Sequence, residues 1–127
     1  MRQVMIIDDD DQVREMLRRM LEYAGYAVQE AGDGDEGLRR LEDRPVDLVI
    51  TDILMPNKEG LETIMTIRRE YPSVPVIAIS GGGWNGAHGY LVTADKLGAS
   101  RTLAKPFTRQ QMLDAVEEVL AQGAQAA

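Results

Sequence analysis

The sequence contains no cysteine, which excludes disulfide bonds. Long apolar runs are also missing, since none approaches the ~18 residues that a membrane-spanning helix needs. The first apolar run, residues 4–7, is followed at once by four aspartates and is too short for the core of a signal peptide. We therefore expect a soluble, cytoplasmic protein without membrane association.

Positive charge is scarce as well. The chain has 14 lysines and arginines against 21 aspartates and glutamates, which gives a net charge of −7. Such a chain repels the phosphate backbone of nucleic acids, and no basic stripe with interleaved aromatic residues offsets the repulsion. We expect no direct nucleic-acid binding.

Short apolar runs alternate with longer segments of helical spacing along the chain. The runs predict strands at residues 4–7, 26–29, 48–51, 74–79 and 102–104. The intervening segments predict helices at residues 12–24, 35–42, 58–70, 89–97 and 108–121. Strict alternation favours a doubly wound α/β fold, with a parallel sheet and helices on both faces. At 127 residues we expect one domain, residues 1–122, and a disordered or frayed tail, residues 123–127.

The helix predicted at residues 12–24 has one apolar face and signals at both ends. Its core-facing positions carry Val13, Met16, Leu17 and Met20. Asp11 is the predicted N-terminal cap, and Gly25 follows the predicted end of the helix.

Polar side chains follow the predicted strands at the end where ligands bind in open α/β sheets. These residues are Asp8 and Asp9, Asp52, Ser80 and Lys105. Two carboxylates 4 Å apart repel each other by ~4 kcal/mol near a protein surface, so a cation is needed to offset the cluster. Mg²⁺ suits oxygen ligands and commonly shares a site with a phosphate. Taken alone, the run of acidic residues would predict a solvated turn, and Asp10 and Asp11 fit that interpretation.

One competing motif lies after the fourth predicted strand. Gly81, Gly83 and Gly86 form the pattern G-x-G-x-x-G, which is typical of dinucleotide sites. Two features argue against a dinucleotide site. The pattern follows the fourth predicted strand rather than the first, and no acidic residue lies ~20 positions further on. Trp84 and His88 lie in the same glycine-rich segment, and we assign neither a ligand role.

Five segments in order resemble the receiver domains of two-component response regulators, the CheY-like family, over residues 2–120. They are "VMIIDDDDQVREML", "DGDEGL", "PVDLVITDILMP", "VPVIAIS" and "TLAKPF". The resemblance implies a flavodoxin-like sheet with strand order 2-1-3-4-5 and a signalling phosphoacceptor rather than an enzyme. It also implies a sensor histidine kinase or histidine phosphotransfer protein as donor, an unknown downstream protein target, and a monomer or a phosphorylation-dependent dimer.

By this resemblance Asp52 is the phosphoacceptor, a carboxylate nucleophile. Asp8, Asp9, Asp52 and the backbone carbonyl of Leu54 are the implied Mg²⁺ ligands.

Lys105 is implied to supply positive charge to the phosphoryl group, and Ser80 to be the switch hydroxyl. The family also commonly has a cis peptide at the step from Lys105 to Pro106, whereas ~5–6% of X-Pro bonds are cis in general.

The sequence departs from the family in two places. Thr102 stands where an aromatic switch residue is usual, so the fifth predicted strand lacks the bulky side chain that aromatic switching uses. Leu54 and Gly82 occupy positions that tune loss of the phosphoryl group to water, and neither side chain can hydrogen-bond a water. We expect slow self-dephosphorylation.

Three other classes of protein remain as alternatives. A phosphatase of the haloacid-dehalogenase type would require a second aspartate two residues after the nucleophile, and Leu54 occupies that position. A flavodoxin-like cofactor carrier would want a Ser/Thr-rich phosphate loop after the first strand. A receiver-shaped interaction module that is never phosphorylated should have lost Asp9, Asp52 or Lys105, and all three are present.

Overall fold

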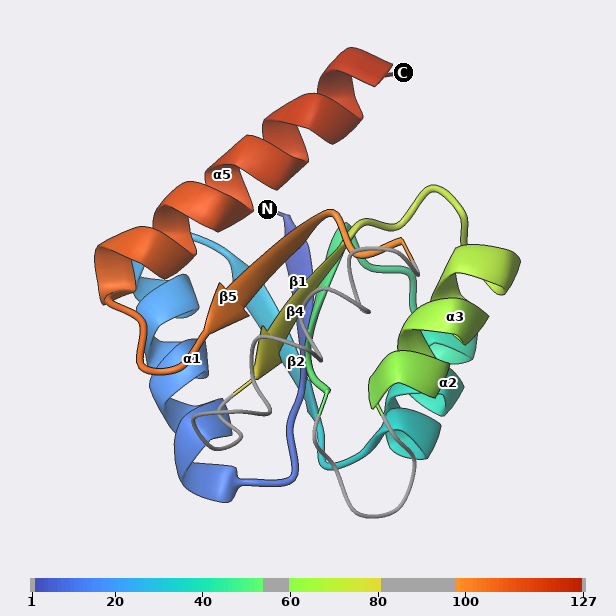
Figure 1. Ribbon diagram of the computed structural model, residues 1–127, viewed down its shortest axis with the longest axis horizontal. Coiled ribbons are helices and arrows are strands. Elements are labelled where there is room, and N and C mark those ends of the chain that lie inside the picture. The colour runs from blue at the N-terminus through green and yellow to red at the C-terminus, as the bar shows by residue number, and fades with distance from the viewer. Residues whose placement is uncertain (1, 54–59, 81–97, 127) are drawn as a thin grey trace.

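The computed structural model describes residues 2–53, 60–80 and 98–126. These residues form a five-stranded parallel sheet in the order β2-β1-β3-β4-β5 (Figure 1). The strands are β1 (Gln3–Ile7), β2 (Ala27–Ala31), β3 (Leu48–Asp52), β4 (Val76–Ser80) and β5 (Arg101–Ala104). The predicted fold class and strand order are therefore confirmed.

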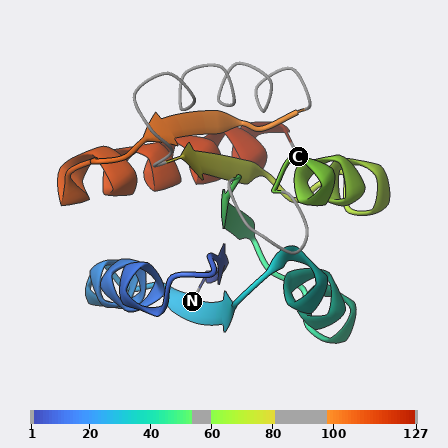
Figure 2. The same cartoon turned by 60° about the horizontal axis from the view of Figure 1, so that its bottom comes forward.

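The described helices cover both faces of the sheet. They are α1 (Asp11–Tyr23), α2 (Gly34–Asp43), α3 (Gly60–Glu70) and α5 (Arg109–Ala126). Helices α1 and α5 lie against one face, and α2 and α3 against the other (Figures 1 and 2). None of these helices is long and apolar enough to cross a membrane.

The central strands are buried on both faces because their side chains alternate between two apolar cores. In β1, Met5 and Ile7 join the core under α2 and α3, whereas Val4 and Ile6 join the core under α1 and α5. All four side chains are fully buried. A continuous apolar run is what a parallel sheet with two covered faces requires.

Helix α1 begins one residue earlier than predicted, and its cap differs. The side chain of Asp10 accepts hydrogen bonds from the backbone amides of Gln12, at 2.9 Å, and Val13, at 3.3 Å. The prediction of Asp11 as the cap was wrong, since Asp11 already lies in the first helical turn. The helix also ends one residue earlier than the predicted residue 24, at Tyr23, and Gly25 follows it with a φ of 100° that favours glycine.

Helix α5 also differs from the prediction at both ends. Thr108 caps it, since its hydroxyl accepts from the Gln111 amide at 3.0 Å and the Gln111 side chain accepts from the Thr108 amide at 2.8 Å. The helix then continues to Ala126, beyond the predicted end at residue 121. Alanine and glutamine are good helix formers, which explains why this composition extends the helix. The domain limits, residues 1–122, and the frayed tail remain predictions.

Several sequence-based expectations lie outside the described residues. They are the helix at residues 89–97, the glycine pattern of Gly81, Gly83 and Gly86, and the individual residues Leu54, Gly82, Trp84 and His88.

Candidate functional site

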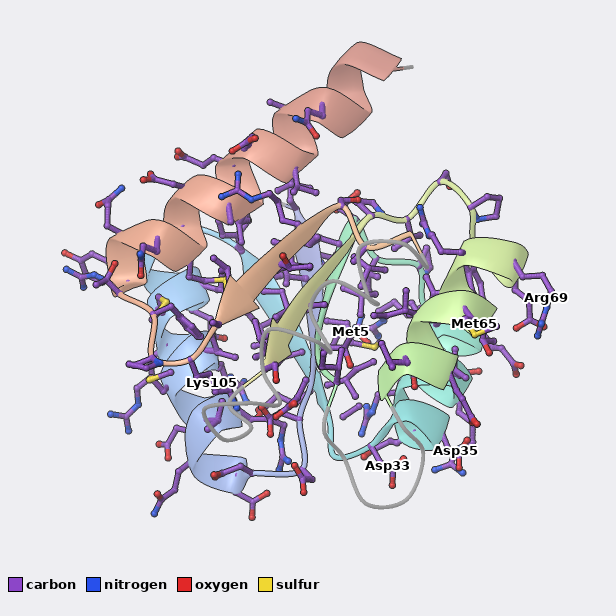
Figure 3. All side chains as sticks on the ribbon, viewed as in Figure 1. Met5, Asp33, Asp35, Met65, Arg69 and Lys105 are labelled. Atoms are coloured by element: carbon purple, nitrogen blue, oxygen red, sulfur yellow. The ribbon has the colours of Figure 1, made fainter. Side chains whose placement is uncertain are left out.

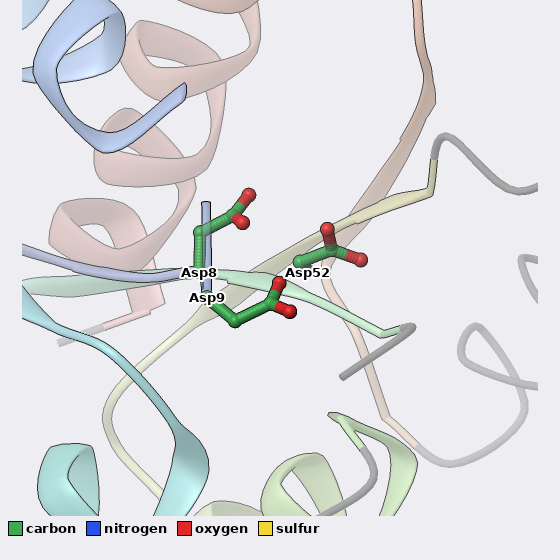
Figure 4. Close-up of side chains that lie close together, drawn as sticks. All are labelled: Asp8, Asp9 and Asp52. Carbon is green, nitrogen blue, oxygen red and sulfur yellow. The ribbon is translucent and has the colours of Figure 1, made fainter. Parts of the chain in front are cut away.

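Three carboxylates meet at the carboxyl ends of β1 and β3. These strands are neighbours, and their register pairs Ile7 with Thr51. Asp8 follows β1 directly and Asp52 ends β3, so the pairing brings the two side chains together. Carboxylate oxygens of Asp8, Asp9 and Asp52 all lie within 4.8 Å of one another (Figure 4). The predicted convergence at this edge of the sheet is therefore observed.

Lys105 brings positive charge to the same cluster from the end of β5 (Figure 3). Its Nζ lies 3.1 Å from Oδ2 of Asp52 and 3.4 Å from Oδ2 of Asp8. The peptide bond between Lys105 and Pro106 is cis. Among the described residues, one ammonium group thus contacts two of the three carboxylates, which leaves the cluster with excess negative charge.

The protonation of Asp8 reflects this crowding. Burial raises the pKa of Asp8 from its ordinary 3.8 to about 6; the nearby Asp52 adds to the rise, and the Asp10 amide and Lys105 oppose it. Burial alone would lower the pKa of Lys105, but the charges of Asp8 and Asp52 outweigh it and raise that pKa. The negative charge of the cluster is therefore only partly offset by Lys105.

Ser80 ends β4 beside this cluster and is fully buried. Its hydroxyl oxygen has no hydrogen-bond partner among the residues that the structure describes. The backbone of Ser80 is held in place, because its carbonyl accepts from the Lys105 amide at 2.8 Å. A fixed residue with a spare hydroxyl group is suited to bind an added polar group. Thr102, at the position of the usual aromatic residue, is half-buried in β5.

Two further residues support the site and were missed in the sequence. Arg14 of α1 donates from Nη1 to the backbone carbonyl of Asp8 at 2.6 Å. A Cβ atom on Gly60, at the start of α3, would lie 2.3 Å from the carbonyl oxygen of Asp52. Both contacts join different elements, so no local sequence pattern reports them.

The donor set fits a hard divalent cation. Asp8, Asp9 and Asp52 offer carboxylate oxygens and no nitrogen or sulfur, which matches the preference of Mg²⁺. Asp9 is exposed, so water can reach the cluster and complete the coordination. By contrast, the third carboxylate of the acidic run, Asp10, is engaged in capping α1.

Comparison with known proteins agrees with this site. Residues 4–117 match the response regulator receiver domain. The chain is 34% identical over 118 residues to the CAI-1 autoinducer sensor kinase/phosphatase CqsS of Vibrio cholerae, covering 91% of the chain and 17% of that protein. It is 31% identical over 120 residues to the transcriptional regulatory protein CpxR of Escherichia coli K12, covering 94% of the chain and 50% of CpxR.

Solved structures give the same result. A response regulator receiver domain protein from Clostridium thermocellum superposes with a TM-score of 0.92 at 28% identity and full coverage of both chains. The chain spans about half the length of CpxR and a smaller share of CqsS. It belongs to the response regulator receiver domain family of two-component signalling.

Proposed function

We propose that Asp52 accepts a phosphoryl group and that Asp8, Asp9 and Asp52 hold the Mg²⁺ ion that assists the transfer. The observation that carries the proposal is the convergence of three carboxylates within 4.8 Å, with the Lys105 ammonium 3.1 Å from Asp52. A bound Mg²⁺ ion neutralises negative charge on a transferring phosphoryl group. The backbone carbonyl of Leu54, which lies outside the described residues, is proposed as a further ligand.

Asp52 acts as the nucleophile in this proposal. One of its carboxylate oxygens forms a bond to phosphorus, and the donor's leaving group departs with the electron pair of the bond that breaks. The product is an acyl phosphate on Asp52. Lys105 then donates a hydrogen bond to a phosphoryl oxygen, because its ammonium group already lies beside the Asp52 carboxylate.

Ser80 is the proposed switch residue. Its buried hydroxyl has no partner among the described residues, so it is free to donate to a phosphoryl oxygen once Asp52 is modified. Such a bond would draw the end of β4 towards Asp52. The surface around β4 and β5 is therefore the proposed output surface.

The donor and the target follow from family membership as proposals. A sensor histidine kinase or a histidine phosphotransfer protein is the proposed donor, and a downstream protein is the proposed target. We also propose a cytoplasmic location and a monomer or a dimer that forms on phosphorylation.

The test is incubation with acetyl phosphate and Mg²⁺, followed by intact-mass measurement. We expect a gain of one phosphoryl group that is lost in Asp52→Asn and on chelation of Mg²⁺. Asp43→Asn, which removes an exposed carboxylate at the end of α2, should retain the gain. A gain that survives in Asp52→Asn would contradict the proposal. No gain in a chain that binds Mg²⁺ would instead favour an interaction module that acts without phosphorylation.

The same experiment measures the lifetime of the phosphoryl group on Asp52. Leu54 and Gly82 cannot hydrogen-bond an attacking water through their side chains, so we propose slow self-dephosphorylation. Removing the acetyl phosphate and following the mass in Mg²⁺ gives the rate. A lifetime of seconds would contradict this part of the proposal.

A further inference from the structure

The guanidinium group of Arg14 bridges three segments beside the acidic turn of residues 8–11. Its Nη1 donates to the backbone carbonyl of Asp8 at 2.6 Å. Its Nη2 contacts the carboxylate of Asp11, and its Nε lies 3.4 Å from Oε1 of Glu30 at the end of β2. The Arg14 side chain is 17% exposed. It therefore connects the turn to the first turn of α1 and to the neighbouring strand.

The contact with Asp8 bears on both of the first two aspartates. The carbonyl of Asp8 belongs to the peptide plane that joins Asp8 to Asp9, so its direction sets where Asp9 points. On the other side of Asp8, its amide donates to the carbonyl of Ala31 at 3.1 Å. The Asp8 backbone is thus held by β2 at its amide and by Arg14 at its carbonyl.

Arg18 provides an internal comparison one helical turn later. Its Nη1 lies 2.7 Å from Oε2 of the same Glu30, and its Nε lies 3.3 Å from Oε2 of Glu22. Its side chain is 47% exposed. In the hydrogen bonds found among the described residues, Arg18 does not reach the acidic turn. The two arginines thus share a helix, a charge and a partner but differ in the contact with Asp8.

We infer that Arg14 is a positioning residue for cation binding, which holds the peptide between Asp8 and Asp9 so that both carboxylates face the site. This inference rests on the proposed Mg²⁺ site. In the contacts found among the described residues Arg14 does not reach Asp52, and its proposed action is through the backbone of the turn. Groups that orient metal ligands typically change metal affinity by about 10–100-fold when they are removed.

The sign of the effect separates positioning from simple charge. A positive charge close to a cation site repels the cation, so charge alone predicts that removal of Arg14 strengthens Mg²⁺ binding. Positioning predicts the opposite, because the freed turn must be ordered again whenever the ion binds. A purely structural role would lower the unfolding midpoint without changing the affinity of the folded protein.

The experiment is isothermal titration of Mg²⁺ into wild type, Arg14→Gln, Arg14→Lys and Arg18→Gln, well below each unfolding midpoint. We expect Arg14→Gln to raise the Kd about tenfold and Arg18→Gln to stay within about twofold of wild type. Arg14→Lys keeps the charge but loses the planar set of donors, so its Kd should fall between those of wild type and Arg14→Gln. If Arg14→Gln fails to fold, the test rests on whether Arg14→Lys has a higher Kd for Mg²⁺ than wild type.

Three other results would overturn the inference. An Arg14→Gln protein that binds Mg²⁺ as tightly as Arg18→Gln, or more tightly, overturns the role of Arg14 and leaves the metal site intact. An Arg14→Lys protein with the wild-type Kd overturns the role of the guanidinium group, since one ammonium donor would then suffice. A wild-type chain that does not bind Mg²⁺ overturns the proposed site and this inference together.

Discussion

Gly60 lies directly against the peptide that carries Asp52. A Cβ atom on Gly60 would stand 2.3 Å from the carbonyl oxygen of Asp52 and 2.3 Å from Cα of Ile53. Both neighbours are backbone atoms, so no side-chain rotation can relieve the clash. The start of α3 can approach the end of β3 this closely because residue 60 has no side chain.

Gly60→Ala should therefore destabilise the protein by about 1–3 kcal/mol, the usual cost of overpacking. Urea denaturation measures the change. Gly32→Ala is the matched control, since a Cβ there would meet its nearest neighbour, Oε1 of Glu36, at an ordinary 3.5 Å. Equal stability of the two variants would show that β3 and α3 separate easily.

Lys105→Met should destabilise the Mg²⁺-free protein by about 2 kcal/mol, because it leaves Asp8 and Asp52 without the cation that offsets their repulsion. The same change should strengthen Mg²⁺ binding, since the ion no longer competes with an ammonium group. Thermal unfolding with and without Mg²⁺ tests both effects. The Mg²⁺-induced rise in Tm should be larger than in wild type, whereas Arg39→Met, on the exposed face of α2, should leave it unchanged.

Asp9→Asn and Asp10→Asn remove the same charge from adjacent positions and should behave differently. The Asp9 carboxylate lies in the acidic cluster, so its loss should raise the Kd for Mg²⁺ about tenfold or more. The Asp10 carboxylate caps α1, a role that asparagine can keep, so the Kd should hardly change. Titration calorimetry gives both values. Equal weakening would mean that net charge, rather than ligand identity, controls affinity.

Ser80→Ala removes a buried hydroxyl that has no partner among the described residues. Its stability before phosphorylation should match wild type within about 1 kcal/mol, because no hydrogen bond is lost. The response to a beryllofluoride mimic should be weaker if Ser80 is the switch residue. Chemical shifts of β4 and β5 before and after the mimic report that response. An unchanged response in Ser80→Ala would remove Ser80 from the switch.

The pKa of Asp8 predicts how stability depends on pH without Mg²⁺. Because burial raises this pKa from 3.8 to about 6, the folded protein binds more protons than the unfolded chain between these values. The resulting stabilisation is complete below pH 3.8 and is lost as the pH rises through about 6. The loss should be about 3 kcal/mol, since one pKa unit corresponds to about 1.4 kcal/mol. The measurement is the free energy of unfolding of wild type and of Asp8→Asn across this pH range. If the difference between the two proteins does not change with pH, the raised pKa of Asp8 is contradicted.

The sequence predicted the sheet and the carboxylate cluster well, for a physical reason. Parallel strands carry their carboxyl ends to one edge, so strand-ending residues such as Asp8, Asp52 and Lys105 could be placed together from their positions alone. Their convergence is observed, while their roles remain predictions. The cap of α1 was misjudged because four consecutive aspartates offer equal side chains, and the backbone turn that selects Asp10 is not visible in the sequence.

What the sequence did not indicate depends on contacts between elements. No role was predicted for Arg14, and its contacts with Asp8 and Glu30 appear only once α1 is packed beside β1 and β2. Gly60 had no predicted role either, because its close approach to the backbone of β3 is visible only in the structure. Neither feature has a local pattern, because each partner is distant in the chain or is a backbone atom.

The strand order has a consequence for folding. Lys105 meets Asp52 across 53 positions of the chain, with β4 between their strands, and Asp8 across 97 positions, with β3 and β4 between. Contacts of such long sequence separation form late and are lost when any intervening strand detaches. A cation bound here would therefore protect the slowest-exchanging amides of the whole sheet, rather than those of one loop.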